Sequence, residues 1–201
     1  MHGLINRSLE SFLSDTYGAS VWRDVVEAAG LGFEHFESMF EYEDWLTYAV
    51  LETAAVRLAK SPDTILEDLG TYLVSSPNVK SVRRLLRFGG FTFVDFLHSL
   101  DDLYDRAKLA VPELELPKFN LLEDGKAGSF KVVCNGPHYG FGRTMLGVLR
   151  AMADDYGALV FMEFHGAGDG FEEISITLVQ SSFADGRDFC LASPENLGGG
   201  V

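Results

Sequence analysis

The 201-residue chain has few cysteines and little positive charge, and each shortage excludes a class of protein. Its two cysteines, Cys134 and Cys190, are too few for a disulfide framework and suit a reducing cytosol. The 16 Lys and Arg residues are outnumbered by 30 Asp and Glu residues, which gives a net charge of −14. Because this charge repels phosphate backbones and anionic lipid, we expect neither nucleic acid nor a membrane as a partner.

Targeting and membrane-spanning segments are also absent from the sequence. Polar side chains interrupt the opening run MHGLINRSLESFL, so it does not form a signal peptide. No apolar run reaches the roughly 20 residues that a membrane-spanning helix needs. We therefore expect a cytoplasmic protein.

Common catalytic motifs are lacking as well. The chain has no Walker A loop, no dinucleotide fingerprint, no Gly-x-Ser-x-Gly elbow and no Cys-x-x-Cys pair. No two of its five histidines have the i, i+3 or i, i+4 spacing of a helical metal site. The residues alone indicate no enzyme, and we expect a protein without catalytic activity.

The residues that are present predict an α+β fold. Hydrophobic residues make up 47% of the chain and include 16 Phe, enough for one sizeable core. Up to about residue 118, apolar residues recur almost throughout at the spacing of helices. After it, 129–133, 158–165 and 173–179 are typical of strands, and a helix is predicted at about 143–156. Helices followed by a small antiparallel sheet with one embedded helix define this class.

This division predicts a single domain over residues 1–180. Its helical part is 1–118, and its sheet-containing part is 119–180. Residues 181–201 lose periodicity and contain three consecutive glycines near the end, which predicts a loosely ordered tail.

Several helix boundaries are marked by capping residues. Ser61 followed by Pro62 predicts a helix start, and Gly70 is a plausible end of that helix. Thr92 is predicted to cap the next long helix, Thr92–Ala110. One apolar stripe runs along one side of that helix. It is made of Phe93, Phe96, Leu97, Leu100, Leu103, Tyr104 and Ala107.

Tyr104 is the most informative residue of this stripe. Its position predicts a phenol that points at the core or at whatever the core encloses. The alternative is an ordinary packed tyrosine with a satisfied hydroxyl. His98 lies off the stripe, and we expect it to face solvent.

Three segments carry a resemblance to a known family. The opening MHGLINRSLESFLSDTYGASVWRDVVEAAGL is similar to the family's first helices, and SPDTILEDLGTYLV to a capped helix leading to a Gly and aromatic pair. The third, FVDFLHSLDDLYDRAKLAVPELELPKF, is similar to the family's proximal segment. Their order and spacing resemble the haem–nitric oxide/oxygen binding (H-NOX) family, whose sensor domain also occurs in soluble guanylate cyclases.

The resemblance implies a haem cofactor, with Tyr104 at the position of the family's axial histidine. Tyrosine ligates haem iron in catalases, so Tyr104 would be an altered metal ligand. Leu4 and Ile5 match the distal side of the family's haem pocket, and Pro117 matches the proline that presses on the macrocycle from the other side. Ordinary core packing is the alternative explanation for these three residues.

The family's Tyr-x-Ser-x-Arg clamp for the haem propionates falls within residues 132–141, where two registers are open. Strand alternation assigns the motif positions to Cys134, Gly136 and His138. Matching Gly140-Phe141 to the family's next two residues assigns them instead to Asn135, Pro137 and Tyr139. Neither register contains the Tyr, Ser and Arg. The side chains left to replace the clamp in part are His138, Tyr139 and Arg143.

Three functional hypotheses follow from the resemblance. The first is a haem-based sensor of a diatomic gas, nitric oxide or oxygen, with altered axial ligation. The second is a haem-free relative that keeps the fold as a regulatory or apolar-ligand-binding module. Either would signal through a partner protein in trans. The third, an enzyme using Tyr104 and His138, is disfavoured because no set of nucleophile, base and orienting residue is visible.

Overall fold

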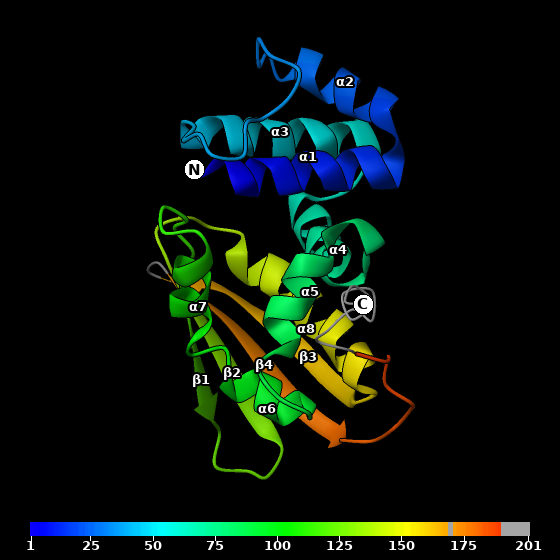
Figure 1. Ribbon diagram of the computed structural model, residues 1–201, viewed down its shortest axis with the longest axis vertical. Coiled ribbons are helices and arrows are strands. Elements are labelled where there is room, and N and C mark those ends of the chain that lie inside the picture. The colour runs from blue at the N-terminus through cyan, green and yellow to red at the C-terminus, as the bar shows by residue number, and fades with distance from the viewer. Residues whose placement is uncertain (169–170, 190–201) are drawn as a thin grey trace, which may run out of the picture.

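The computed structural model describes residues 1–168 and 171–189 (Figure 1). None of the helices in these ranges is long and apolar enough to cross a membrane. In chain order the elements are α1 (Gly3–Tyr17), α2 (Ala19–Ala28), α3 (Asp44–Leu58), α4 (Pro62–Ser75), a 3-10 turn (Pro77–Val79), α5 (Lys80–Arg87), α6 (Phe93–His98), α7 (Leu103–Ala110), β1 (Lys118–Glu123), β2 (Ser129–Asn135), α8 (Phe141–Tyr156), β3 (Leu159–Gly168) and β4 (Phe171–Gln180).

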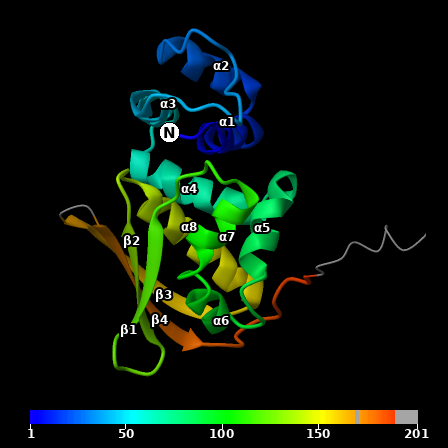
Figure 2. The same ribbon diagram turned by 60° about the vertical axis from the view of Figure 1, so that its left-hand side comes forward.

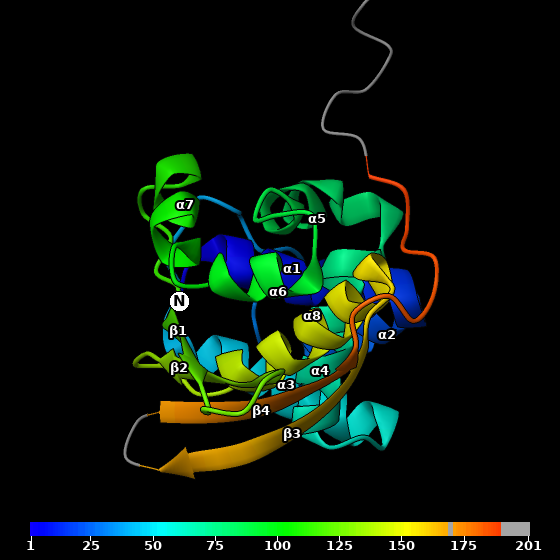
Figure 3. The ribbon, with the colours of Figure 1, turned by 90° about the horizontal axis from the view of Figure 1, so that it is seen from below.

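The elements form two parts that α4 connects. Helices α1, α2 and α3 make an N-terminal helical unit at one end of the molecule (Figures 1 and 2). The other part, called the body below, is the sheet with α8 on one face, α5 and α6 beyond α8, and α7 over the β1 end of the sheet (Figure 3). The predicted α+β class is confirmed.

Four antiparallel strands form the sheet in the order β1-β2-β4-β3. The inner face alternates as the sequence predicts, with Val132 of β2 opposite Ile174 of β4 and both side chains fully buried. β1 is a strand that the sequence analysis missed. It is an edge strand with Phe119 as its one buried side chain, so it lacks the alternation that would identify it.

The predicted single helix Thr92–Ala110 is two helices, α6 and α7. Thr92 and Asp95 form a capping box at the start of α6, as the predicted cap requires. The hydroxyl of Ser99 then donates to the carbonyl of Phe96 at 2.7 Å, and the chain turns before α7 begins. Arg106 fixes the corner by donating to the backbone oxygens of Ser99 and Leu85 at 2.8 and 3.1 Å.

This break ends the predicted apolar stripe. Leu103 and Ala107 remain buried on α7, but Tyr104 is only half-buried. Tyr104 is therefore less enclosed than the predicted stripe requires, because the turn between the helices interrupts the stripe. His98 is exposed, as predicted.

Gly70 does not end its helix, contrary to the prediction. α4 begins as expected, with the Ser61 hydroxyl accepting from the amide of Thr64, but it continues to Ser75. A Cβ atom at Gly70 would lie 1.9 Å from the carbonyl oxygen of Thr144 on α8. A Cβ atom at Gly147 would lie equally close to the carbonyl of Glu67. Both glycines therefore serve the close crossing of α4 and α8.

Each part has a core of its own. In the N-terminal unit the apolar side chains of α1, α2 and α3 pack with those of α4, including Phe12, Trp22, Val50, Leu51 and Ile65. In the body α8 packs between the sheet on one side and α5 and α6 on the other, with Phe96, Leu100, Leu149, Met152 and Ile176 at its centre. The bridge between these cores is α4, which contributes side chains to both.

The first part of the predicted tail is bound rather than loose. The amides of Phe183 and Ala184 donate to the carbonyl of Gly157, and the amide of Arg187 donates to the carbonyl of Asp155. Residues 181–189 therefore lie against the end of α8. Residues 190–201, with Cys190, are outside the described residues.

Candidate functional site

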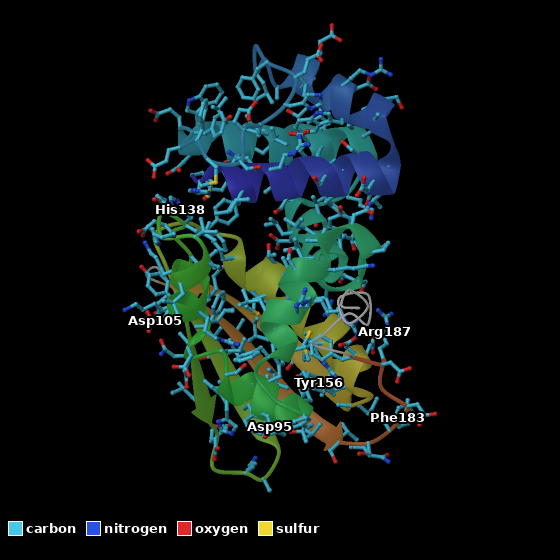
Figure 4. All side chains as sticks on the ribbon, in the orientation of Figure 1. Asp95, Asp105, His138, Tyr156, Phe183 and Arg187 are labelled. Atoms are coloured by element: carbon cyan, nitrogen blue, oxygen red, sulfur yellow. The ribbon has the colours of Figure 1, made fainter. Side chains whose placement is uncertain are left out.

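His138, labelled in Figure 4, lies where the β2–α8 loop meets the N-terminal unit. Pro117 is buried just before β1, and the β2–α8 loop closes over it. A Cβ atom at Gly136 would lie 2.8 Å from the Cβ of Pro117, so these two segments are already in contact. The cavity beside them has a volume of about 10 Å³ and is lined by Glu115, Leu116, Pro117, Gly136, Pro137, His138 and Phe141. Such a volume holds one water molecule.

Tyr104 lies between two ammonium groups. The Nζ atoms of Lys108 and Lys118 are 5.7 and 5.5 Å from its ring centroid, within the range of cation–π attraction. Lys108 is itself bound to Glu115 at 2.9 Å. The Tyr104 side chain therefore takes part in a half-buried charged cluster along α7.

Alternation along β2 turns Cys134 inward and leaves Asn135 exposed. Cys134 is buried against the core of the body, and burial together with the nearby carboxylate of Glu172 raises its pKa to about 12. The sulfur is therefore a neutral thiol at physiological pH. Metal ligation and nucleophilic chemistry both need the thiolate.

His138 and Tyr139 connect the β2–α8 loop to α3. His138 Nδ1 lies 3.4 Å from a carboxylate oxygen of Asp44. The Tyr139 ring stacks on Tyr48 with centroids 5.0 Å apart and planes 10° from parallel. Burial is the main cause that raises the pKa of both phenols. The two residues thus hold the body against the N-terminal unit.

Arg143 of α8 has partners on α4 and on the sheet for its guanidinium. Its guanidinium lies 3.0 Å from a carboxylate oxygen of Asp63 and 3.1 Å from one of Glu67, both on α4. The same group covers the ring of Phe164 at 3.8 Å from the centroid. These contacts hold it on α4 and on the sheet.

Glu172 is a site residue that the sequence analysis missed. Its buried carboxylate accepts from the amide of Gly142 at 2.8 Å and from that of Gly140 at 3.2 Å. The amides at the start of α8 would otherwise form an anion-binding site. The signal was present in the sequence, because Glu172 continues the inward alternation of Ile174 and Ile176 with a charged residue.

Leu4 and Ile5 lie in the first turn of α1, and both are half-buried. Ile5 stands four and seven residues before Leu9 and Phe12, so all three share one side of the helix. Phe12 packs its ring on Tyr72 of α4 at 5.5 Å. Ile5 thus lies on the side of α1 that meets α4.

The residues described here do not fit a haem. An axial ligand must aim a donor into a cavity, but Tyr104 stands between two lysines and the cavity beside Pro117 holds one water. Pockets that bind drug-sized ligands have volumes of roughly 300–1,000 Å³. Two propionates need cationic or amide donors, and Arg143 and the Gly140 and Gly142 amides are bound to the chain's own carboxylates.

Comparison with solved structures identifies the fold. The Fe(II) unliganded H-NOX protein of K. algicida aligns with a TM-score of 0.76 and 15% identity, over 92% of this chain and 100% of that one. An H-NOX protein of S. oneidensis aligns with a TM-score of 0.76 and 18% identity, over 90% and 98% of the two chains. The fold is thus that of an H-NOX domain.

Sequence comparison gives the family. A model of the haem-NO-binding family matches residues 2–163, and the chain belongs to this family. Soluble guanylate cyclase gcy-31 of Caenorhabditis elegans is 23% identical over 128 residues, which are 64% of this chain and 18% of the cyclase. Soluble guanylate cyclase 89Da of Drosophila melanogaster is 21% identical over 156 residues, which are 78% and 23% of the two chains. The chain therefore spans less than a quarter of either relative.

Proposed function

We propose that this chain is a haem-free signalling module that retains the fold of the haem-NO-binding family. The observation that carries the proposal is the closed contact between Pro117 and Gly136, which leaves a cavity of about 10 Å³. The groups that could donate to haem propionates, Arg143 and the amides of Gly140 and Gly142, are bound to carboxylates of the chain itself. The hypothesis of a gas sensor with Tyr104 as iron ligand is less well supported, because Tyr104 lies between Lys108 and Lys118.

A module of this kind acts through its junction instead of through a cofactor. The N-terminal unit is joined to the body by α4 and by the contacts of His138 with Asp44 and of Tyr139 with Tyr48. Contacts of these two types are each worth about 1.5 kcal/mol or less, so they open and close easily. Movement of the N-terminal unit on the body would be the signal, and a partner protein in trans would respond to it.

Absorption spectroscopy tests this function. The purified full chain is titrated with haem, with the H-NOX protein of S. oneidensis as a positive control. We expect no stoichiometric Soret band from this chain, and a weak, unsaturable signal of the kind that adventitious haem gives. A saturable Soret band at one haem per chain would reject the haem-free function and restore the gas-sensor hypothesis.

A further inference from the structure

Four large apolar side chains are exposed on segments that reach the junction. Met39, Phe40 and Trp45 are 65%, 62% and 58% exposed, and Tyr139 is 52% exposed. These four residues are called the junction patch below. Single exposed apolar residues are normal on a soluble protein, but a cluster marks an interaction site.

The patch comes from three segments that meet at one edge of the molecule. The carbonyl of Phe40 accepts from the amide of Gly3, which fixes this loop beside the start of α1. Trp45 is in the first turn of α3, three residues before Tyr48, on which Tyr139 stacks. The chain's N-terminal end and the loop of His138 lie at this same edge (Figures 1 and 4).

The surroundings of the patch are strongly acidic. Residues 24–56 contain eight Asp and Glu residues and no Lys or Arg. The net charge of the whole chain is −14. Glu37, Glu41 and Glu43 alternate with the patch residues along the loop, and all three are exposed. An acidic rim around apolar anchors favours a partner of the opposite charge.

We propose that the junction patch is the docking surface for a basic segment of a signalling partner, one that inserts apolar side chains between Met39, Phe40, Trp45 and Tyr139. A second copy of this chain is disfavoured as the occupant, because it would bring the same carboxylates against the rim. The proposal rests on the proposed function, since it names the surface through which such a module signals.

The position of the patch explains how a partner would sense the junction. Trp45 belongs to the N-terminal unit, and Tyr139 belongs to the body. A segment that contacts both side chains binds only when the Tyr48–Tyr139 stack holds the two parts together. Binding and junction closure are therefore linked, and each promotes the other.

Peptide binding to the full-length protein tests the surface. The probe is a synthetic amphipathic peptide of Lys and Leu, and a peptide of Glu and Leu with the same length is the control. Trp22 is 3% exposed, so acrylamide quenches mainly Trp45. We expect the Lys and Leu peptide to protect Trp45 from quenching, with an affinity that falls as salt is added, and the Glu and Leu peptide to have no effect.

Matched variants identify the site, with the anisotropy of a labelled peptide as the readout. We expect Trp45→Ala and the double variant E41K/E43K each to weaken binding about tenfold or more. The controls are Phe161→Ala and Glu163→Lys on the exposed face of β3, which should leave the affinity unchanged. All five substituted positions are exposed, and a thermal melt checks that each variant folds.

Three results would overturn the proposal. In the first, acrylamide quenches Trp45 equally with and without bound peptide. In the second, the β3 control variants weaken peptide binding as much as the patch variants do. In the third, sedimentation shows a dimer of the protein that Trp45→Ala dissociates. The haem titration is independent of these measurements. A chain that bound haem and also bound the peptide at this patch would refute the haem-free function and leave the docking surface standing.

Discussion

The contacts inside the body are much stronger than the contacts between the N-terminal unit and the β2–α8 loop. In the body, the fully buried carboxylate of Asp155 lies 2.8 Å from the guanidinium of Arg83 and 3.6 Å from that of Arg87. The glycines of α4 and α8 let two backbones touch. The contacts of the N-terminal unit with the β2–α8 loop are the partly exposed contact of His138 with Asp44 and a partly exposed ring stack.

This difference indicates which region moves. Contacts that bury charge or close-pack two backbones cost several kcal/mol to break, whereas exposed pairs cost about 1 kcal/mol or less. The body therefore acts as a rigid base. Under the proposed function, the junction is the place where a docked partner segment would change the structure.

The largest effect is expected in the body, from Asp155→Asn. This change leaves Arg83 and Arg87 without their buried carboxylate, and breaking such a pair costs about 3–5 kcal/mol. Urea denaturation measures the loss. The control is Asp154→Asn, one residue away and exposed, which should stay within about 0.5 kcal/mol of the parent. Equal effects at the two positions would mean that Asp155 does not anchor the body.

Glu172→Gln is expected to give the next largest effect. The amides of Gly140 and Gly142 lose a charged acceptor, which is worth about 1.5–3 kcal/mol. Denaturant melts and hydrogen exchange at the start of α8 measure the change. The neighbouring Glu173, bound to Lys131 on the outer face, is the matched control, and Glu173→Gln should cost less than about 1 kcal/mol. A silent Glu172→Gln would contradict the anion-binding role of these amides.

A smaller effect is expected from alkaline pH. The pKa of Cys134 is raised from 9.0 to about 12 in the folded protein, so the folded state holds the thiol proton more tightly than the unfolded state. Its contribution to stability is complete below pH 9 and is lost as the pH rises toward 12. At pH 10 the loss is about 1 kcal/mol. Cys134→Ala should remove this part of the pH dependence, and an identical alkaline slope in both proteins would contradict the shift.

The smallest effect on global stability is expected at the junction, from Tyr139→Ala. Loss of the ring stack costs about 0.5–1.5 kcal/mol. Hydrogen exchange should nevertheless increase in α1 and α3 while that of α8 is unchanged, because the N-terminal unit alone is released. Phe161→Ala on β3 is the matched control. Faster exchange throughout the chain, or no change in α1 and α3, would contradict the assignment of the junction as the movable region.

Local signals in the sequence predicted the α+β class and the caps at Ser61 and Thr92, since these depend on residues within one turn. Tertiary contacts caused the errors. The break before α7 is fixed by Arg106 reaching Ser99 and Leu85, and Gly70 serves a close approach to Thr144 of α8, 74 residues later. Neither partner is visible from local periodicity.

For the candidate site, the sequence analysis named the segments that meet at the junction but not their contacts. The resemblance assigned Pro117 and the 132–141 segment to one haem pocket, and in the structure Gly136 of that segment packs on Pro117. The ion pairs of Arg143 with Asp63 and Glu67, and the cap that Glu172 provides, join elements distant in sequence. Alternation along one strand could suggest that Glu172 is buried, but not which amides it binds.

The central claim is that this junction no longer accepts a haem, and Tyr104→His tests it most directly. The variant supplies the axial ligand of the family while the contact of Pro117 with Gly136 and the ion pairs of Arg143 stay as they are. The folded variant is reconstituted with haem, reduced and exposed to nitric oxide, and its absorption spectrum is recorded. We predict no stoichiometric Soret band and no nitric oxide adduct. A Soret band at one haem per chain that shifts with nitric oxide would contradict the haem-free function.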